Sequence, residues 1–331
     1  MYFKEKHILV IGGTGTIGKS IINTILPEKP RRITILSRDE HKQQLLQQEL
    51  GEEETLHYII GDIRDYDTVN EAMRSVDLVF HLAAMKRVDF SEANPFETVK
   101  TNILGTQNVI QAAISQQVEK VIFTSSDKAI SPTNAYGASK LIAERLIIQA
   151  NRSGLIDTTF ACVRFGNVMG SRGSVIPLFI ESILNERKIT ITDPTMTRFM
   201  MTLDQATKLT IQAMKEAKGR EVFVLKMPVV RIGLLAEVVL EEICQREQID
   251  KDNVEIQVVG KRIGEKMYEE LMTEDEAKKA WETSDMFIIP RSATISYPNV
   301  NKAEATYYNS HSQTPLSKEK LRSLLLSEKL I

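Results

Sequence analysis

Two residues four positions apart carry the most informative chemistry in this chain. Tyr136 and Lys140 lie in a segment, 135–146, whose apolar spacing predicts a helix, so both side chains project from one face. A lysine ammonium beside a phenol favours the phenolate, and lowering a tyrosine pKa from about 10 toward neutrality takes roughly 4 kcal/mol of differential interaction. The pair therefore predicts a tyrosine base. Ordinary surface pairs of tyrosine and lysine share this spacing, so the neighbouring residues must distinguish a catalytic pair from a surface pair.

The residues before this helix favour the catalytic interpretation. The apolar run 121–123 predicts a buried strand, and hydroxyl and charged side chains follow it. Ligands bind beyond the carboxyl ends of strands in open α/β sheets, so these side chains are expected to face a cleft. A surface ion pair at a strand end is the alternative to a catalytic Asp–Lys pair. We expect the catalytic centre to comprise Ser126, Asp127, Lys128, Tyr136 and Lys140.

A glycine-rich turn follows the first predicted strand, 7–11. Gly12, Gly15 and Gly18 have the spacing that allows a tight turn, close approach of the backbone to a pyrophosphate, and close packing of the next helix. The N-terminus of that helix favours negative phosphates. Glycine spacing alone is weak evidence, but its position between a strand and an apolar-periodic helix meets the structural condition for dinucleotide binding.

The end of the second predicted strand bears on the choice of cofactor. An acid here binds the ribose hydroxyl of NAD, whereas an arginine accommodates the 2′-phosphate of NADP. Arg38 comes first, with Lys42 a turn later, although Asp39 and Glu40 weaken the signal. We expect NADP, with NAD as the less favoured alternative. Asp62, after the third predicted strand, can reach the adenine ring or serve only as a turn residue.

Alternating strands and helices through about residue 165 predict an α/β fold, a doubly wound parallel Rossmann sheet. We expect a dinucleotide-binding domain over 1–166, with later returns of the chain to the sheet. A smaller mixed α/β C-terminal lobe, 167–300, is expected to bind substrate, and 301–331 to form a tail with a short helix. A further helix is predicted to begin near Met267.

Composition excludes several classes of function. With 331 residues, 42% hydrophobic content and a net charge of −2, the chain is globular and has no basic field for nucleic acid. No apolar run approaches the ~18 residues of a membrane span. Cys162 and Cys244 lie far apart, and the N-terminal residues lead directly into a strand, which favours the cytoplasm. The histidines are isolated, so no metal is expected.

Apolar outer positions on the Tyr136 helix predict self-association. Ile142, Leu146 and Ile147 are placed to pack against a symmetry-related copy. We therefore expect a homo-oligomer, either a dimer or a hexamer.

Together these segments resemble the extended short-chain dehydrogenase/reductase superfamily, and within it the UDP-N-acetylglucosamine 4,6-dehydratases of polysaccharide and pseudaminic acid biosynthesis. The resemblance covers nearly the whole chain. Its most specific motifs are Ser126–Ala129, Tyr136–Lys140, Arg164–Val175, Met196–Phe199 and Gly264–Lys266. Ser126 replaces the more usual threonine and Phe165 the more usual tyrosine, and neither change removes an essential proton carrier.

The resemblance implies that Asp127, Lys128 and Tyr136 do the chemistry, while Lys140 holds the cofactor ribose and tunes the tyrosine. Tyr136 would take the proton of the sugar 4-hydroxyl as hydride leaves carbon 4 for NADP. Two adjacent groups of different type suit the next step, with Lys128 as base at carbon 5 and Asp127 as acid for the 6-hydroxyl. Hydride then returns to carbon 6. A neutral Lys128 needs a lowered pKa, which burial near a cationic nicotinamide would promote.

Two larger sets of residues follow from this interpretation. The expected cofactor contacts are Gly12, Thr14, Gly15, Thr16, Ile17, Gly18, Ser37, Arg38, Asp39, Lys42, Asp62, Ile63, Leu82, Ala83, Ala84, Lys86, Thr101, Asn102, Tyr136 and Lys140. The expected contacts to the UDP-N-acetylglucosamine substrate, or a related UDP-sugar, are Lys86, Asn167, Val168, Ser171, Arg172, Val175, Thr190, Arg198, Arg262 and Glu265.

The same residues also fit alternative functions. A 4-epimerase or a 5-epimerase of the same superfamily also needs Tyr136 and a base, but no acid aimed at the 6-hydroxyl. The dehydratase itself would retain or invert carbon 5. A non-catalytic NADP-binding sensor is a remote alternative, because every proton carrier is retained.

Overall fold

A doubly wound parallel sheet organises the molecule. The computed structural model describes residues 1–151, 155–171, 173–262, 264–291, 297 and 300–331. Within these residues the parallel strands run, in spatial order, β3 (Leu56–Ile60), β2 (Arg32–Ser37), β1 (His7–Ile11), β4 (Leu78–His81), β5 (Lys120–Ser126), β6 (Thr159–Phe165) and β10 (Val222–Leu225). The first six have the order typical of dinucleotide-binding folds, which confirms the predicted fold class.

The C-terminal part of the chain extends this sheet. Strand β15 (Met286–Ile289) pairs antiparallel with β10, and β14 (Trp281–Glu282) and β16 (Asn301–Lys302) follow at the edge. The chain thus returns to the sheet after leaving it for the second lobe.

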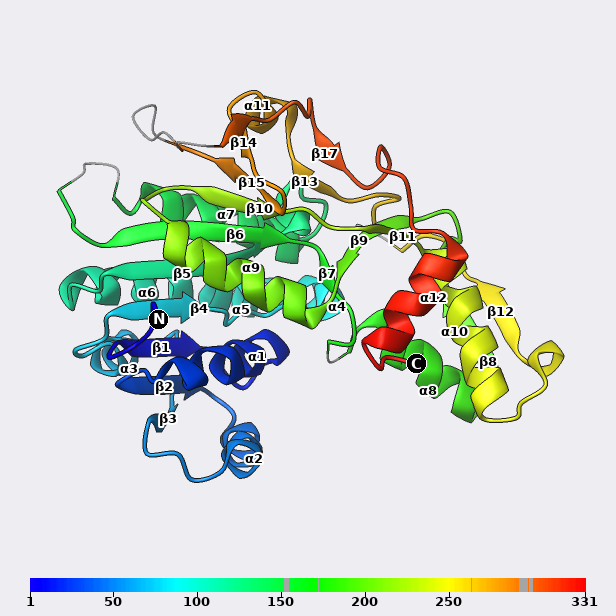
Figure 1. The fold of residues 1–331 in the computed structure, drawn as a ribbon, viewed down its shortest axis with the longest axis horizontal. Coiled ribbons are helices and arrows are strands. Elements are labelled where there is room, and N and C mark those ends of the chain that lie inside the picture. The colour runs from blue at the N-terminus through cyan, green and yellow to red at the C-terminus, as the bar shows by residue number, and fades with distance from the viewer. Residues whose placement is uncertain (152–154, 172, 263, 292–296, 298–299) are drawn as a thin grey trace.

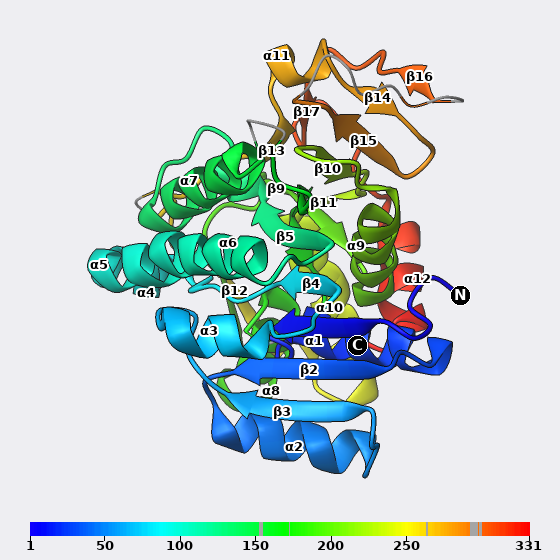
Figure 2. The ribbon, with the colours of Figure 1, turned by 90° about the vertical axis from the view of Figure 1, so that its left-hand side faces the viewer.

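Helices cover both faces of the sheet (Figure 2). One face carries α1 (Thr16–Ile25) and α9 (Leu203–Glu216), which pack against each other. The other face carries α3 (Tyr66–Ala72), α6 (Gly105–Ser115) and α7 (Ala135–Gln149). The strands lie between two apolar layers, so the residues that leave their ends start from a rigid platform.

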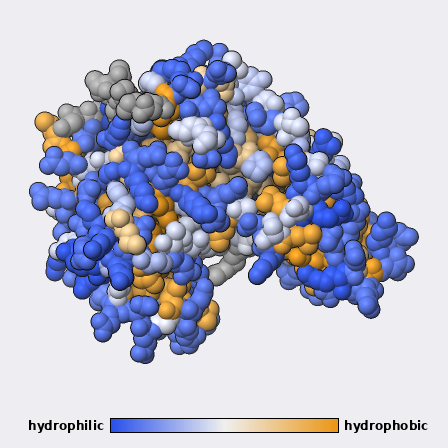
Figure 3. All heavy atoms as spheres, in the orientation of Figure 1, coloured by the Kyte–Doolittle hydropathy of each residue, from blue (hydrophilic) through white to orange (hydrophobic). Residues whose placement is uncertain are grey.

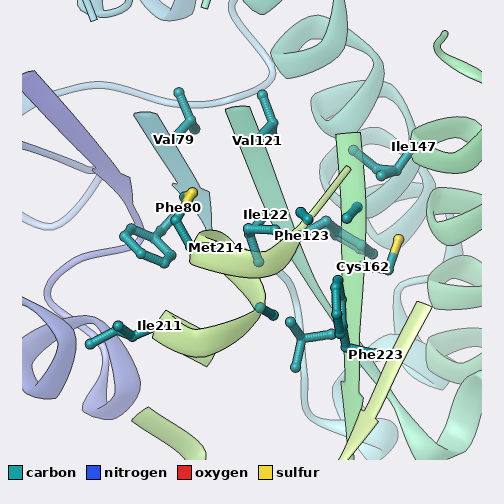
Figure 4. Packing of buried hydrophobic residues seen from close by; sticks show 14 of the residues in the cluster. Val79, Phe80, Val121, Ile122, Phe123, Ile147, Cys162, Ile211, Met214 and Phe223 are labelled. Carbon is teal, nitrogen blue, oxygen red and sulfur yellow. The ribbon is translucent and has the colours of Figure 1, made fainter. Parts of the chain in front are cut away.

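The core between these layers is continuous (Figure 4). Ile211 and Met214 reach it from α9, and Ile147 reaches it from α7; all three residues are buried. Burying a large aliphatic side chain contributes about 1.5–3 kcal/mol. The prediction that Ile147 lies on an outer position is therefore wrong, because its side chain packs inward, whereas Ile142 on the same helix is 46% exposed.

A second lobe lies beyond the carboxyl ends of the parallel strands (Figure 1). It contains α8 (Val175–Glu186), α10 (Ile232–Arg246), α12 (Lys318–Ser327) and the parallel pair β8 (Lys188–Ile191) and β12 (Glu255–Val258). A separate apolar cluster holds these elements together. The small sheet of β7 (Asn167–Val168), β9 (Thr197–Met201) and β11 (Val229–Arg231) connects the lobe to the main sheet.

The surface is hollowed where the lobe meets the main sheet layer, and the exposed face there is mainly hydrophilic (Figure 3). None of the helices in the described parts of the chain is long and apolar enough to cross a membrane.

The segment after Met267 differs from the prediction. No helix begins there; β13 (Glu270–Met272) pairs antiparallel with β17 (Tyr308–Asn309), and only the short α11 (Glu274–Ala277) follows. The difference arises from tertiary structure. The backbone of this segment finds its hydrogen-bond partners in a strand near the C-terminus, and local periodicity cannot reveal such a partner.

Candidate active site

The end of β5 and the start of α7 bring the predicted proton carriers together. A 3₁₀ turn, Asp127–Ala129, follows β5, and the side chain of Asn134 caps α7 by accepting from the Gly137 N–H at 2.8 Å. A Cβ atom at Gly137 would lie 2.3 Å from the Lys128 carbonyl oxygen. Glycine at this position therefore lets α7, and with it Tyr136, pack directly against the turn.

Asp127 is buried and held from one side. Its Oδ1 accepts hydrogen bonds from the Ser126 hydroxyl at 2.8 Å, the Lys128 N–H at 2.9 Å and the Lys128 ammonium at 3.1 Å. Its Oδ2 has no hydrogen-bond partner among the described residues, although only 1% of the residue is exposed. The carboxyl group is thus fixed through one oxygen and leaves the other for a proton or a ligand.

Lys128 lies between two carboxylates. Its Nζ is 3.1 Å from Asp127 Oδ1 and 3.5 Å from Glu269 Oε1. Burial opposes the ammonium, but the charges of Asp127 and Glu269 outweigh this effect and raise the pKa of Lys128 above its ordinary value. The direction is opposite to the predicted one, because two buried carboxylates contact the amine.

Tyr136 also departs from the simple prediction. Its side chain is buried. Burial raises the pKa of Tyr136, while the Ser126 hydroxyl and the charge of Lys128 act in the lowering direction. The cation that acts on the phenol is therefore Lys128, although the four-residue spacing had indicated Lys140.

Lys140 is buried beside the end of β5. Its Nζ donates to the Thr124 carbonyl at 2.6 Å and lies 4.1 Å from the centre of the Phe123 ring. Burial lowers the pKa of Lys140 to about 7, against smaller opposing effects of Cys162 and Glu144. This lysine is thus close to losing its proton at neutral pH.

Glu269 was missed by the sequence analysis. It is 4% exposed, and its Oε2 has no hydrogen-bond partner among the described residues. Its backbone N–H donates to the Ser310 hydroxyl at 3.0 Å, and its carbonyl accepts from the Ser310 N–H at 2.8 Å. A glutamate in a charged stretch far from the catalytic motif carries no local signal, so only the folded chain reveals its place beside Lys128.

The charged loop before Glu269 docks on the catalytic segment. The Gly264 carbonyl accepts from the Thr133 hydroxyl at 2.6 Å, and the Lys266 ammonium donates to the Ile130 carbonyl at 2.8 Å. These bonds join the loop to the residues that lead into α7. Two parts of the chain that are distant in sequence therefore form one wall of the site.

Several predicted sugar contacts meet at β9. Arg198 on β9 donates to the Lys266 carbonyl at 2.9 Å and lies 3.4 Å from Glu265. Asn167 donates to the Phe199 carbonyl at 3.1 Å, and Val168 follows it on β7. The guanidinium of Arg198 therefore holds the loop in place, and its contact with a sugar stays a prediction.

Other predicted sugar contacts are more dispersed. Thr190 is exposed on β8, Val175 is the first residue of α8, and Ser171 donates its N–H to the Val168 carbonyl. Arg262 is exposed and donates its N–H to Glu265, and Lys86 is exposed between β4 and α4 (Val88–Ala93). Arg172 lies outside the described residues.

The glycine turn has the predicted form. Gly12 has a φ of +82°, and a Cβ atom there would lie 2.9 Å from the backbone nitrogen of Ala83. The turn therefore touches the end of β4, where Leu82, Ala83 and Ala84 are partly exposed. Gly15 caps α1 with no side-chain hydrogen bond, which leaves the first N–H groups of the helix for phosphate.

A cavity of about 730 Å³ continues from this turn and is lined by Thr14, Ser37, Arg38, Asp39, Lys42, Ile60, Gly61, Asp62 and Arg64. Three of these, Ile60, Gly61 and Arg64, were not predicted. Asp62 accepts from Arg64 at 2.8 Å and lies 3.5 Å from Arg38. Asp39 caps α2 (Glu40–Leu50) by accepting from the Lys42 N–H at 3.0 Å, and also pairs with its ammonium.

Other predicted cofactor residues support the cleft from behind. A π-helical segment, Val99–Leu104, follows α5 (Pro95–Thr98), and its Asn102 accepts from the Met85 N–H at 2.8 Å and donates to the Ser139 hydroxyl at 2.9 Å. Thr101 and Ile63 are buried. Asn102 thus fixes the β4 loop against α7, and Ile63 belongs to the apolar core.

Comparisons with known proteins point to sugar-nucleotide chemistry. The model of a family described as polysaccharide biosynthesis protein matches residues 8–291. A UDP-glucose 4-epimerase from Rickettsia rickettsii is 39% identical over 337 residues, covering 98% of this chain and 96% of that protein. The crystal structure of Pen from Bacillus thuringiensis is 56% identical, covers 100% of both chains and has a TM-score of 0.95.

A more distant structure shares the fold alone. DesIV from Streptomyces venezuelae, a dTDP-glucose 4,6-dehydratase with NAD bound, is 22% identical, covers 79% of this chain and 86% of its own, and has a TM-score of 0.71.

Proposed function

This chain belongs to the polysaccharide biosynthesis protein family, and we propose that it is an NADP-dependent UDP-N-acetylglucosamine 4,6-dehydratase. Its product would be a UDP-4-keto-6-deoxy-N-acetylhexosamine for bacterial surface glycan or flagellin sugar synthesis. The observation that carries this proposal is the contact of a buried acid, Asp127, with an amine, Lys128, beside the phenol of Tyr136.

The nucleotide pocket supports NADP over NAD. Asp39, the acid best placed in sequence to bind a ribose hydroxyl, caps α2 and pairs with Lys42. The side chain of Arg38 is 53% exposed at the same pocket, and its contact with Asp62 is long, at 3.5 Å. Arg38 is thus available for a 2′-phosphate. When bound, NADP would supply the hydride acceptor at carbon 4 and, once reduced, the hydride donor at carbon 6.

The first step falls to Tyr136 and Ser126. Tyr136 as phenolate takes the proton of the 4-hydroxyl as hydride leaves carbon 4. The Ser126 hydroxyl donates to Asp127 at 2.8 Å and acts on the pKa of the Tyr136 phenol in the lowering direction. A proton on Tyr136 can therefore pass through Ser126 to Asp127. This transfer restores the phenolate and converts the Asp127 carboxylate into a carboxylic acid.

Water loss falls to Asp127 and Lys128. The neutral amine of Lys128 removes the proton from carbon 5, which the 4-ketone has acidified. Asp127 gives the proton that it received through Ser126 to the departing 6-hydroxyl as the bond between carbon 6 and that oxygen breaks. Lys128 then returns a proton to carbon 5 as hydride reaches carbon 6. The proton of the 4-hydroxyl leaves in the water molecule, so the cycle needs a path from Tyr136 to Asp127.

A UDP-sugar 4-epimerase is the second candidate, because the 39% identical relative from Rickettsia rickettsii carries that name. Such an enzyme uses Tyr136 to oxidise carbon 4 but needs no acid directed at carbon 6. A 5-epimerase acting on a 4-keto sugar is a further member of this class. The burial of Asp127 against the Lys128 ammonium favours the dehydratase over both, and over a non-catalytic NADP sensor, because buried charges without a task are costly.

The decisive experiment is incubation of the protein with UDP-N-acetylglucosamine and NADP, followed by mass spectrometry of the nucleotide sugar. Loss of one water molecule is expected. A product of unchanged mass with an axial 4-hydroxyl would instead assign the epimerase. Proton NMR of the product formed in heavy water then reports whether carbon 5 is retained or inverted.

We also propose that the protein is a homo-oligomer, a dimer or a hexamer. Large apolar side chains are exposed on the neighbouring elements α4, α5, the π-helical segment and α7, namely Phe90, Phe96, Leu104 and Ile142. Light scattering of the protein and of Phe96→Glu tests this, with a smaller particle expected for the variant. A monomeric wild-type protein would contradict it.

A further inference from the structure

The proposed dehydration sets a requirement that the catalytic motif alone does not meet. Before water loss Tyr136 must be a phenolate, Asp127 an acid and Lys128 a neutral amine. Asp127 becomes an acid by taking the Tyr136 proton through Ser126, so it cannot also take a proton from Lys128. Lys128 is held as an ammonium in its ion pairs. A further group must accept the Lys128 proton.

Glu269 is placed to be that group. Its Oε1 lies 3.5 Å from Lys128 Nζ, and Asp127 Oδ1 lies 3.1 Å from the same nitrogen. Its Oε2 is buried and has no partner among the described residues. The bonds of its backbone to Ser310 fix its position.

We propose that Glu269 is a positioning residue that acts through Lys128, by taking the proton that Lys128 must lose before it can remove the proton from carbon 5. This inference rests on the proposed dehydratase function. An N–H bond of the ammonium breaks, its electron pair stays on nitrogen, and an O–H bond forms on Glu269. The amine then takes the carbon 5 proton. The electrons of that C–H bond form the C5–C6 double bond, and the departing oxygen takes the Asp127 proton.

The charges around the pair are compatible with this transfer. Lys128 faces Asp127, Tyr136 and Arg198 besides Glu269, and Glu269 also faces Lys266. Burial raises the pKa of Glu269, and the charge of Asp127 acts in the same direction, against Lys128, Arg198 and Lys266. A carboxyl group in this environment accepts a proton more readily than an exposed glutamate. Glu269 can thus hold the proton of the ammonium while Lys128 acts as the base at carbon 5.

The test compares Glu269→Gln, Glu269→Asp and the neighbouring Glu270→Gln. With Glu269→Gln we expect water loss at pH 7 to fall about 100-fold, the order of a general acid–base contribution. Reduction of bound cofactor by the substrate should stay within about threefold, because it depends on Tyr136. Glu269→Asp should regain part of the lost rate, and Glu270→Gln should stay within about twofold of wild type.

The pH profile separates this role from a structural one. In Glu269→Gln only solvent can deprotonate Lys128, so the rate of water loss should rise about tenfold per pH unit above pH 7. A wild-type rate in this variant, or an equal loss of cofactor reduction and water loss at every pH, would overturn the inference. If Glu269→Gln is less stable than the wild type, the ratio of the rate of water loss to the rate of cofactor reduction in Glu269→Asp still tests the inference. A wild-type protein that loses no water refutes the proposed function instead.

Discussion

The proposed adenine end and the proposed catalytic end of the site both combine carboxylates with cations, but in opposite environments. At the proposed adenine end Arg38 and Arg64 contact Asp62, and the side chains of Arg38, Arg64 and Asp62 are 53%, 38% and 23% exposed. At the catalytic end Lys128 contacts Asp127 and Glu269, and their side chains are 23%, 1% and 5% exposed. Each end thus holds carboxylates with cations, but only the charged groups around Asp62 are freely open to water.

This difference in burial separates binding from proton transfer. Exposed ion pairs are worth about 0–1 kcal/mol, so Arg38 can leave Asp62 for a phosphate at little cost. Buried charges interact strongly, and each one sets the protonation state of its neighbours. The adenine end is therefore suited to exchange partners, and the catalytic end to move protons. The following predictions test this contrast.

Removing the cation of the buried end should have the largest effect. Lys128→Ala is expected to lower the rate of water loss by about 10²–10⁴-fold, because no other amine in the described parts of the chain contacts both carboxylates. Bound cofactor should still be partly reduced by the substrate, which absorbance of the reduced nicotinamide detects. Release of the 4-keto-6-deoxy product at the normal rate would refute Lys128 as the base.

The second buried lysine should make stability depend on pH. Burial lowers the pKa of Lys140 to about 7 from 10.5, so between these values the unfolded chain binds more protons than the folded one. The free energy of unfolding of the wild type, relative to Lys140→Met, should then rise with pH by up to about 1.4 kcal/mol per unit.

Urea unfolding of both proteins at pH 7, 8 and 9 measures this difference. Lys208→Met is the matched control, because the side chain of Lys208 is 69% exposed. A difference that stays flat with pH would show that Lys140 keeps its proton.

At the exposed end, a change of charge should alter the choice of cofactor. Arg38→Asp is expected to weaken NADP binding about 10- to 100-fold, the value of a charge-assisted contact to phosphate, and to weaken NAD binding far less. Fluorescence titration with both nucleotides measures the ratio. Equal weakening of the two would mean that Arg38 does not contact a 2′-phosphate.

The smallest effect is expected from an exposed ion pair. Arg64 contacts Asp62 at 2.6 Å and Glu97 at 2.7 Å, but its side chain is 38% exposed. Arg64→Ala should lower the free energy of unfolding by less than about 1 kcal/mol, and by less still in high salt. A loss of several kcal/mol, measured by urea unfolding, would show that solvent and salt do not screen the ion pair of Arg64 and Asp62. That result would contradict the difference in burial between the two ends.

Local signals found the parts of the site that lie next to each other in the chain. The glycine turn at Gly12, the arginine after β2 and the segment from Ser126 to Lys140 each combine residue type, spacing and position after a strand. The doubly wound sheet followed from alternating periodicity, and its strand order confirmed it. Glu269 had no such signal, because its partners lie in distant parts of the chain.

The sequence by itself determined which proposed proton carriers lie close together and in what order, since hydroxyl, carboxyl, amine and phenol groups come from one short strand–turn–helix unit. Only the tertiary structure decided their charge states. The charges of Asp127 and Glu269 raise the pKa of Lys128 against the opposing effect of burial, while burial lowers the pKa of Lys140. A pKa depends on every charge and every dielectric boundary within a few ångströms, and folding alone brings those together.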